Sequence, residues 1–249
     1  MKSRPFALQP AFHPAWNAFL DALFPPRCAG CFEWSRDVFC ARCTLQLRPI
    51  DAPLCESCGA PFDPLAYCAS ICVQCREKTP SFLAARSAFH FEGPLREAVH
   101  RFKYREKTAL AARLAPFLAQ TMARDAALSE FRPQALVPVP LHGARHKKRG
   151  FNQSALLARE LGASLGVPVA ELLKRTRDTP PQVGLNRKQR AANVRGAFVM
   201  DAARSDQKGA RILLIDDVYT TGATLRECAR VLKKAGASEI CALTLARLK

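Results

Sequence analysis

The stretch ILLIDDVYTTGATL, residues 212–225, changes character twice within fourteen positions. Its first four residues are large and apolar, which predicts a buried strand over 212–215. Asp216 and Asp217 follow, so we expect them at the carboxyl end of that strand, the edge at which α/β sheets bind ligands. Residues 220–224, Thr-Thr-Gly-Ala-Thr, then lead into a helix expected over 224–235.

The chemistry of these residue types points to a sugar phosphate. Two neighbouring carboxylates can accept hydrogen bonds from the hydroxyls of a vicinal diol. A loop that opens a helix presents backbone N–H groups, and the helix dipole favours an anion there. An ordinary strand–turn–helix with an acidic cap is the alternative. The sequence predicts a ribose 5-phosphate site formed by Asp216, Asp217, Thr220, Thr221, Gly222, Ala223 and Thr224.

On both sides of this stretch, strand patterns alternate with helix patterns. Strands are expected over 87–92, 135–140, 196–200, 211–217 and 239–247, with 167–173 strand or extended. Helices are expected over 151–165 and 224–235, and 95–122 predicts one helix or two separated near Pro116. Residues 176–192 predict a long loop or a poorly held helix. The alternation predicts an α/β fold with a mostly parallel sheet and helices on both faces.

Nine of the 11 cysteines lie between Cys28 and Cys75. Eight of them form four Cys-x-x-Cys pairs, and two such pairs can close one tetrahedral zinc site. The predicted metal ligands are Cys28, Cys31, Cys40 and Cys43 for one site, and Cys55, Cys58, Cys72 and Cys75 for the other. Redox or incidental thiols are the alternative. Cys68 is a spare thiol or a substitute ligand, and Cys228 and Cys241 are expected to be buried apolar residues.

The cysteine pattern and the sheet pattern divide the chain into three parts. Residues 1–27 form an N-terminal segment with an amphipathic helix over 15–24, expected to pack on the protein rather than on a membrane surface. Residues 28–80 form a double zinc ribbon, and residues 81–249 form the α/β domain. Neither an export signal nor an apolar run of about 18 residues is visible, so we expect a cytoplasmic protein without a transmembrane segment.

Three stretches of the sequence resemble those of known protein families. Residues 212–225 closely resemble the phosphoribosyl pyrophosphate (PRPP) signature of type I phosphoribosyltransferases. The segment VPVPLHGARHKKRGFNQSALLARELG, residues 137–162, resembles the hallmark of the ComF family of competence-associated, phosphoribosyltransferase-like proteins. A third matching pattern is Gln182-x-x-Leu185-x-Arg187-x-x-Arg190-x-x-Asn193-Val194. The resemblance runs from about Leu23 to Leu248, and it implies a type I phosphoribosyltransferase-like sheet with an N-terminal zinc ribbon.

The resemblance implies a role for each part of the site. Asp216 and Asp217 would hold the ribose hydroxyls, and residues 220–224 the 5-phosphate. The loop 141–150 would correspond to the pyrophosphate loop and the segment 176–195 to a flexible lid, acting with Mg²⁺. The basic candidates there are Arg145, Lys147, Arg149, Arg187, Lys188 and Arg190. A solvated basic loop is the alternative for their side chains.

One departure from related enzymes concerns proton transfer. Purine-salvage members of the superfamily carry a carboxylate inside the PRPP loop, whereas this chain has Thr220 and Thr221 there. His142 and His146 are the remaining candidate acid or base groups, and no nucleophile is visible. PRPP binding is therefore better supported than transfer to any particular acceptor.

The charge distribution keeps a second function open. The chain carries a net charge of +17, of which residues 1–80 contribute +1 and residues 81–249 contribute +16. One hypothesis is a Mg²⁺-dependent phosphoribosyltransferase linked to DNA uptake. The other is a PRPP-sensing protein that binds single-stranded DNA and DNA-uptake proteins. Phe102, Tyr104 and Phe151 would either stack on bases or belong to the core.

Overall fold

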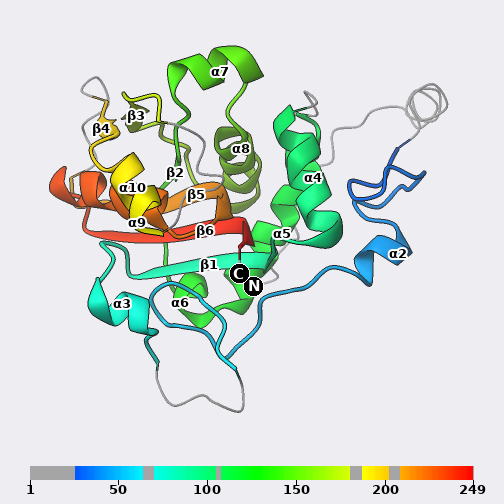
Figure 1. Ribbon diagram of the computed structural model, residues 1–249, viewed down its shortest axis with the longest axis horizontal. Coiled ribbons are helices and arrows are strands. Elements are labelled where there is room, and N and C mark those ends of the chain that lie inside the picture. The colour runs from blue at the N-terminus through cyan, green and yellow to red at the C-terminus, as the bar shows by residue number, and fades with distance from the viewer. Residues whose placement is uncertain (1–25, 64–69, 105–107, 180–186, 202–207, 249) are drawn as a thin grey trace, which may run out of the picture.

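A four-stranded parallel sheet forms the centre of the computed structural model, which describes residues 26–63, 70–104, 108–179, 187–201 and 208–248 (Figure 1). The strand order is β1-β6-β5-β2, and each neighbouring pair is parallel. The strands are β1 (Ala84–His90), β2 (Ala135–Pro138), β5 (Arg211–Tyr219) and β6 (Glu239–Arg247). A separate antiparallel pair joins β3 (Leu173–Arg175) to β4 (Phe198–Met200).

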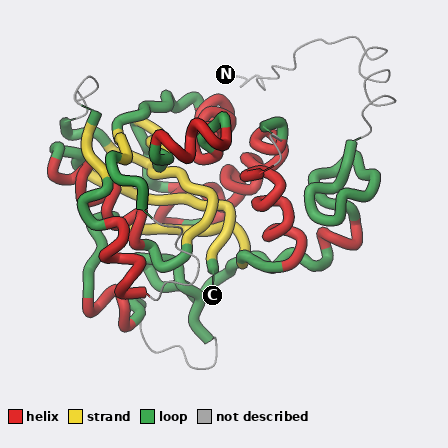
Figure 2. The backbone as a smooth tube through the Cα atoms, turned by 45° about the horizontal axis from the view of Figure 1, so that its top comes forward, coloured by secondary structure: helices red, strands yellow, loops and turns green. Residues whose placement is uncertain are grey.

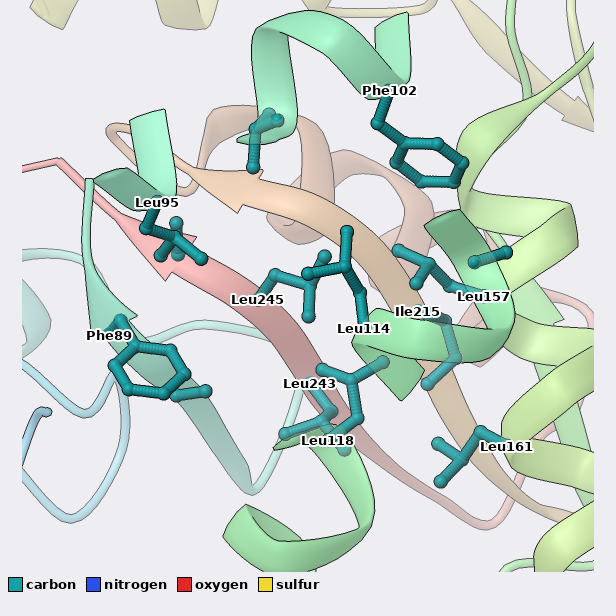
Figure 3. Close-up of a cluster of buried hydrophobic side chains, with 14 of the residues drawn as sticks. Phe89, Leu95, Phe102, Leu114, Leu118, Leu157, Leu161, Ile215, Leu243 and Leu245 are labelled. Carbon is teal, nitrogen blue, oxygen red and sulfur yellow. The ribbon is translucent and has the colours of Figure 1, made fainter. Parts of the chain in front are cut away.

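Helices cover both faces of the sheet because successive strand residues point to opposite sides. Leu213 and Ile215 of β5 belong to a core shared with α4 (Gly93–Tyr104), α5 (Leu110–Arg124) and α8 (Gln153–Leu165). Figure 3 shows ten labelled members of this core, among them Phe102, Leu114 and Leu157. Ile212 and Leu214 face a second core, which α10 (Ala223–Lys234) covers. The predicted arrangement of helices on both faces is therefore present.

The two cysteine-rich modules join the cores on opposite faces of the sheet. The first contains α2 (Ala41–Thr44), and its Cys28 and Cys43 join the core of α4 and α5. The second contains α3 (Val73–Glu77), and its Cys55, Cys58 and Cys75 join the core of α10. Apart from these short helices and isolated β-bridges, the described residues of both modules form loops (Figure 2). With so little regular structure of their own, they depend on the sheet and on metal for stability.

Several expected boundaries are corrected by packing. Pro116 lies inside α5 and does not end it, because Leu114 and Leu118 on either side are both fully buried in the core. The proline removes one backbone hydrogen bond, and this packing outweighs the loss. The strand expected over 87–92 is β1 at 84–90. Of residues 167–173 only Leu173 lies in a strand, and Val169 forms an isolated bridge to Leu136.

Two corrections concern the expected site. Strand β5 continues to Tyr219, paired with Arg247 of β6, so Asp216 and Asp217 lie inside the strand. Residues 143–149 of the expected pyrophosphate loop form helix α7 (Gly143–Arg149). Part of the expected lid forms a helix, α9 (Arg187–Val194), which agrees with one of the two alternatives given for residues 176–192. A four-residue helix, α6 (Ala126–Ser129), was not predicted.

Some predictions lie outside the described residues. They are the helix over 15–24, Cys68, the lid residues 180–186, and the side chains of Tyr104, Arg187 and Lys188. None of the helices that the structure describes has the length and hydropathy needed to span a bilayer.

Candidate functional site

The two acidic residues of β5 are held by side chains from two helices. Lys103 of α4 places its Nζ 2.7 Å from Oδ2 of Asp217, whose side chain is almost fully buried. At the start of α8, Gln153 Nε2 donates to the same oxygen over 3.4 Å, and Ser154 Oγ donates to Asp216 Oδ1 over 2.8 Å. The carboxylates are thus fixed in place, with one lysine as their direct cationic partner among the described residues.

Burial and mutual repulsion act strongly on this pair. Burial, followed by the negative charge of Asp217, raises the pKa of Asp216 to about 7, although the Ser154 hydroxyl and Lys103 act in the opposite direction. Two adjacent carboxylates, one buried and one half-buried, favour a site that accepts hydrogen bonds from hydroxyl groups, or a cation, because either relieves the repulsion.

Asp216→Asn is expected to stabilise the protein at pH 8 by on the order of 3 kcal/mol, and at pH 5 by about a third of that. The unfolded chain releases this proton above about pH 4, whereas the folded protein keeps it up to a pKa of about 7. The parent therefore loses stability as the pH rises through that window, and Asn, which cannot ionise, does not. Urea denaturation at the two pH values measures the difference. An equal stability gap at pH 5 and pH 8 would contradict the raised pKa.

The Thr-Gly loop, residues 220–224, runs from the end of β5 into the first residues of α10, and its glycine has a left-handed backbone conformation. Gly222 has φ 73° and begins α10 as its N-cap. A Cβ at this position would overlap the hydroxyl of Tyr219, so the position requires glycine both for φ and for space. The Tyr219 side chain is buried beneath the loop, and burial raises its pKa to about 12.

Two buried polar atoms at the Thr-Gly loop and the acidic pair have no hydrogen-bond partner among the described residues. They are Thr221 Oγ1 and Gln153 Oε1. Buried polar atoms are rarely left unpaired, so their presence here favours a ligand that supplies the partners. Thr221 directly precedes the N-cap of the twelve-residue helix α10, an end at which an anion is stabilised. The local chemistry fits a phosphorylated, hydroxyl-rich molecule.

The basic candidates do not all lie together. Arg145 of α7 donates to the carbonyl of Thr179, and its Nε is 3.6 Å from Asp178 Oδ1, so it connects α7 to the first part of the lid. Lys147 is exposed on α7, and Arg149 is half-buried. Arg190 lies on α9, as do Arg187 and Lys188. His142 caps α7 and faces Asp178, whereas His146 is exposed.

Sequence reasoning missed Lys103 and Arg175. Lys103 sits in the pattern Arg-Phe-Lys-Tyr, in which no spacing distinguishes it from other helix lysines. Arg175 donates to Thr179 Oγ1, and its buried Nε has no partner among the described residues. Burial, and then the charge of Arg145, lowers the pKa of Arg175. Gln153 and Ser154 belong to the quoted family segment, and the structure adds their contact with the acidic pair.

The eight predicted cysteine ligands come together in two groups of four. Within each group all Sγ atoms lie within 4.8 Å of one another. The distance is 3.7 Å between the Sγ atoms of Cys31 and Cys40, and 3.7 Å between those of Cys58 and Cys72. Gly59 of the second group has φ 68°, and Phe32 of the first group has φ 70°.

The donor sets fit zinc. In the first group burial is outweighed by backbone N–H donors from Cys40 and Cys31, which lower the pKa of Cys28 to about 6, while burial and neighbouring thiols raise that of Cys43 to about 12. Four thiolates this close repel one another unless a cation binds them, and soft sulfur ligands in a closed tetrahedron are typical of structural zinc. The two four-cysteine clusters therefore support structural zinc.

Phe102 and Phe151 belong to the core, with ring centroids 6.1 Å apart. Phe102 is fully buried, so the core interpretation holds for it and base stacking does not. Cys228 and Cys241 are buried as predicted, with 0% and 1% of their surface exposed.

Comparisons with known proteins agree with this organisation. The phosphoribosyl transferase domain model matches residues 136–248, and the double zinc ribbon domain model matches residues 19–76. Competence protein F of Haemophilus influenzae is 33% identical over 88% of this chain and 95% of that protein. DNA utilization protein YhgH of Salmonella typhimurium is 33% identical over 86% of this chain and 91% of that protein.

Among solved structures, the glutamine PRPP amidotransferase of B. subtilis aligns with a TM-score of 0.39 and 19% identity, over 58% of this chain and 30% of that one. The family models, together with the parallel sheet and the cysteine clusters, confirm the predicted fold class. By its identity to Competence protein F over nearly the full length of both chains, this protein belongs to the ComF family.

Proposed function

We propose that this protein binds PRPP together with Mg²⁺ at the Thr-Gly loop. One observation carries the proposal: the paired carboxylates of Asp216 and Asp217 adjoin a helix N-terminus at which the buried Thr221 Oγ1 has no partner among the described residues. Diol acceptors beside an anion site match a ribose 5-phosphate. The phosphoribosyl transferase domain match over residues 136–248 supports the same ligand class.

Each side chain would have a distinct task in holding the ligand. Asp216 and Asp217 accept hydrogen bonds from the ribose hydroxyls, and Lys103 holds the Asp217 carboxylate in place. The amides and hydroxyls of Thr220, Thr221, Gly222, Ala223 and Thr224 donate to the 5-phosphate. When bound, Mg²⁺ would supply charge neutralisation of the pyrophosphate group.

The pyrophosphate would be held from α7 and the lid. Arg145 already connects α7 to Thr179, so movement of the lid would move the residues around it. The remaining basic candidates are Lys147, Arg149, Arg187, Lys188 and Arg190. Closure of such a lid excludes water, which strengthens each charge interaction inside.

We further propose a role in DNA uptake, in the cytoplasm, with DNA-uptake proteins as partners. The relatives named Competence protein F and Competence protein ComFC support it. Transfer of the phosphoribosyl group from PRPP to an acceptor is the first candidate activity. Within the Thr-Gly loop no carboxylate is available to move a proton, since positions 220 and 221 are both threonine.

The second candidate is a PRPP-sensing protein that binds single-stranded DNA without catalysis. The charge favours it: residues 81–249 carry +16, and Lys147 and Lys148 are exposed on α7. Contacts between such cations and phosphates supply most non-specific affinity for nucleic acids. Turnover of PRPP with bases, amines and DNA ends tests the first candidate, and silence with all of them would count against it. Binding of single-stranded DNA that does not weaken with salt would contradict the second.

Gly222→Ala is expected to weaken binding of PRPP with Mg²⁺ by more than about 100-fold, because the new Cβ forces Tyr219 and the loop apart. The matched control is Gly209→Ala, which has a similar φ of 75° but nothing within 4 Å of its Cβ. This control isolates the cost of the backbone conformation from that of the overlap. Calorimetric titration with PRPP and Mg²⁺ measures both variants, and equal affinities for Gly222→Ala and the parent would refute the assignment of the loop.

A further inference from the structure

Hydrogen bonds join the second cysteine cluster to strand β6 of the sheet, close to the Thr-Gly loop. Arg247 of β6 donates from Nη1 to the carbonyl of Cys58 over 2.7 Å, and its Nη2 lies 3.6 Å from Cys58 Sγ. This arginine is only 8% exposed. A buried guanidinium requires compensating negative charge, so its neighbours decide whether it stays in place.

A second arginine reaches the same cluster from α10, the helix that the Thr-Gly loop begins. Arg226 donates from Nη2 to Cys75 Sγ over 3.3 Å and from Nη1 to the carbonyl of Lys78 over 2.7 Å. Arg226 is four residues beyond the glycine of the loop, and its backbone N–H donates to the Gly222 carbonyl over 2.9 Å. The cluster is thereby joined to the first turn of the helix.

The positive charge of these two arginines balances the negative charge of a zinc-loaded site. Four thiolates around one divalent ion leave two net negative charges, which sulfur atoms carry. Arg226 and Arg247 supply two positive charges, each bonded to a different sulfur of the cluster.

Arg247 in turn supports the loop through Tyr219. The two residues are opposite each other in the β5–β6 pairing, and the guanidinium lies 4.2 Å from the centre of the Tyr219 ring. That ring fills the space a side chain at Gly222 would need. A continuous set of contacts therefore runs from Cys58 through Arg247 and Tyr219 to the glycine of the Thr-Gly loop.

Among the described residues, no comparable set of contacts joins the first cluster to the Thr-Gly loop. The arginine that hydrogen-bonds its Cys31 is Arg42, which is exposed on α2 of the same module. Its attachment to the α/β domain is at α4 and α5 instead, where Arg101 donates to the carbonyl of Ala29 over 2.6 Å and Arg113 to that of Arg27 over 2.9 Å. The second module also has an attachment independent of Arg247, because Ala85 N donates to the carbonyl of Ser57 over 2.8 Å.

We propose that the second four-cysteine zinc site sets the conformation of the Thr-Gly loop, with Arg226 and Arg247 as positioning residues that transmit its charge. The inference rests on the proposed function in that the loop is taken as the 5-phosphate site. It assigns the second zinc module a part in ligand binding, in addition to stabilising the fold.

The test compares Arg247→Met with the parent protein in its zinc-loaded form. The variant should retain two zinc ions, since all eight ligands and the Ala85–Ser57 attachment remain. We expect its affinity for PRPP with Mg²⁺ to fall about tenfold, and amide exchange over residues 219–224 in the ligand-free protein to rise about tenfold. Arg42→Met is the matched control, which removes an arginine from the first cluster, and it should behave as the parent does.

The two readouts separate this inference from the proposed function. Exchange is measured without PRPP, so faster exchange in Arg247→Met supports the connection even if the parent binds no PRPP. A parent that binds PRPP, with a variant unchanged in both affinity and exchange, would overturn the connection alone. Should Arg247→Met fail to fold, Arg226→Met replaces it, because that side chain is only half-buried and contacts the same cluster.

Discussion

The double substitution Asp216→Ala/Asp217→Ala is expected to abolish measurable binding of PRPP with Mg²⁺ while the protein stays folded. The two carboxylates are the proposed acceptors for the ribose hydroxyls, and one charge-assisted hydrogen bond contributes about 1.5–3 kcal/mol. Loss of both should therefore weaken binding by about 100-fold or more. The fold should persist because the acidic pair is a source of repulsion, as the raised pKa of Asp216 indicates.

A control with the same change in net charge separates local contact from general electrostatics. Glu130→Ala/Glu239→Ala also removes two acids, both of them exposed, and Glu239 lies at the opposite end of β6 from the site. Calorimetry should show parental affinity for this control. If the aspartate variant kept its affinity, or if both double variants lost it equally, the assignment of the acidic pair would be refuted.

Removal of zinc by a strong chelator is expected to cause the largest loss of stability. Structural zinc sites contribute about 10–16 kcal/mol of binding free energy in small modules, which is as large as the total stability of a typical domain, about 5–15 kcal/mol. Both modules contain little besides loops and very short helices. The parent should hold two zinc ions per chain, one for each four-cysteine cluster, and its melting temperature should fall sharply after chelation.

Single substitutions identify which cluster binds each ion. Cys31→Ser and Cys72→Ser should each leave one zinc ion, because each removes a ligand from a different cluster. Cys241→Ala should retain two, since that buried cysteine belongs to neither cluster. One zinc ion per parent chain would contradict the structural role of the second site. A melting temperature that does not change on chelation would contradict the structural role of both sites.

The elements around residues 212–225 could be predicted from the sequence because their signals are local. Four apolar residues require burial, and a Thr-Gly turn before a helix pattern requires a loop, so β5 and α10 appear close to their expected positions. The cysteine spacing likewise predicted the two sets of metal ligands, and the members of each set lie close together as predicted. The roles of Asp216, Asp217 and residues 220–224 toward PRPP remain predictions.

What the sequence could not supply depends on contacts between distant segments. Lys103 pairs with Asp217 only because α4 crosses the end of β5, and nothing in its own neighbourhood indicates this. Strand β5 extends past Asp217 because β6 provides partners for Val218 and Tyr219. The bonds from Arg226 and Arg247 to the second cluster join segments 151 and 189 residues apart, a separation that no spacing rule detects.

A crystal structure of the zinc-loaded protein with PRPP and Mg²⁺ tests the central claim most directly. We predict that the ribose hydroxyls lie within hydrogen-bond distance of Asp216 and Asp217, and that Thr221 Oγ1, which has no partner among the residues described, donates to the 5-phosphate. The 5-phosphate should occupy the Thr-Gly loop at the start of α10. PRPP bound away from β5 and α10, or a vacant loop at saturating PRPP, would contradict the account.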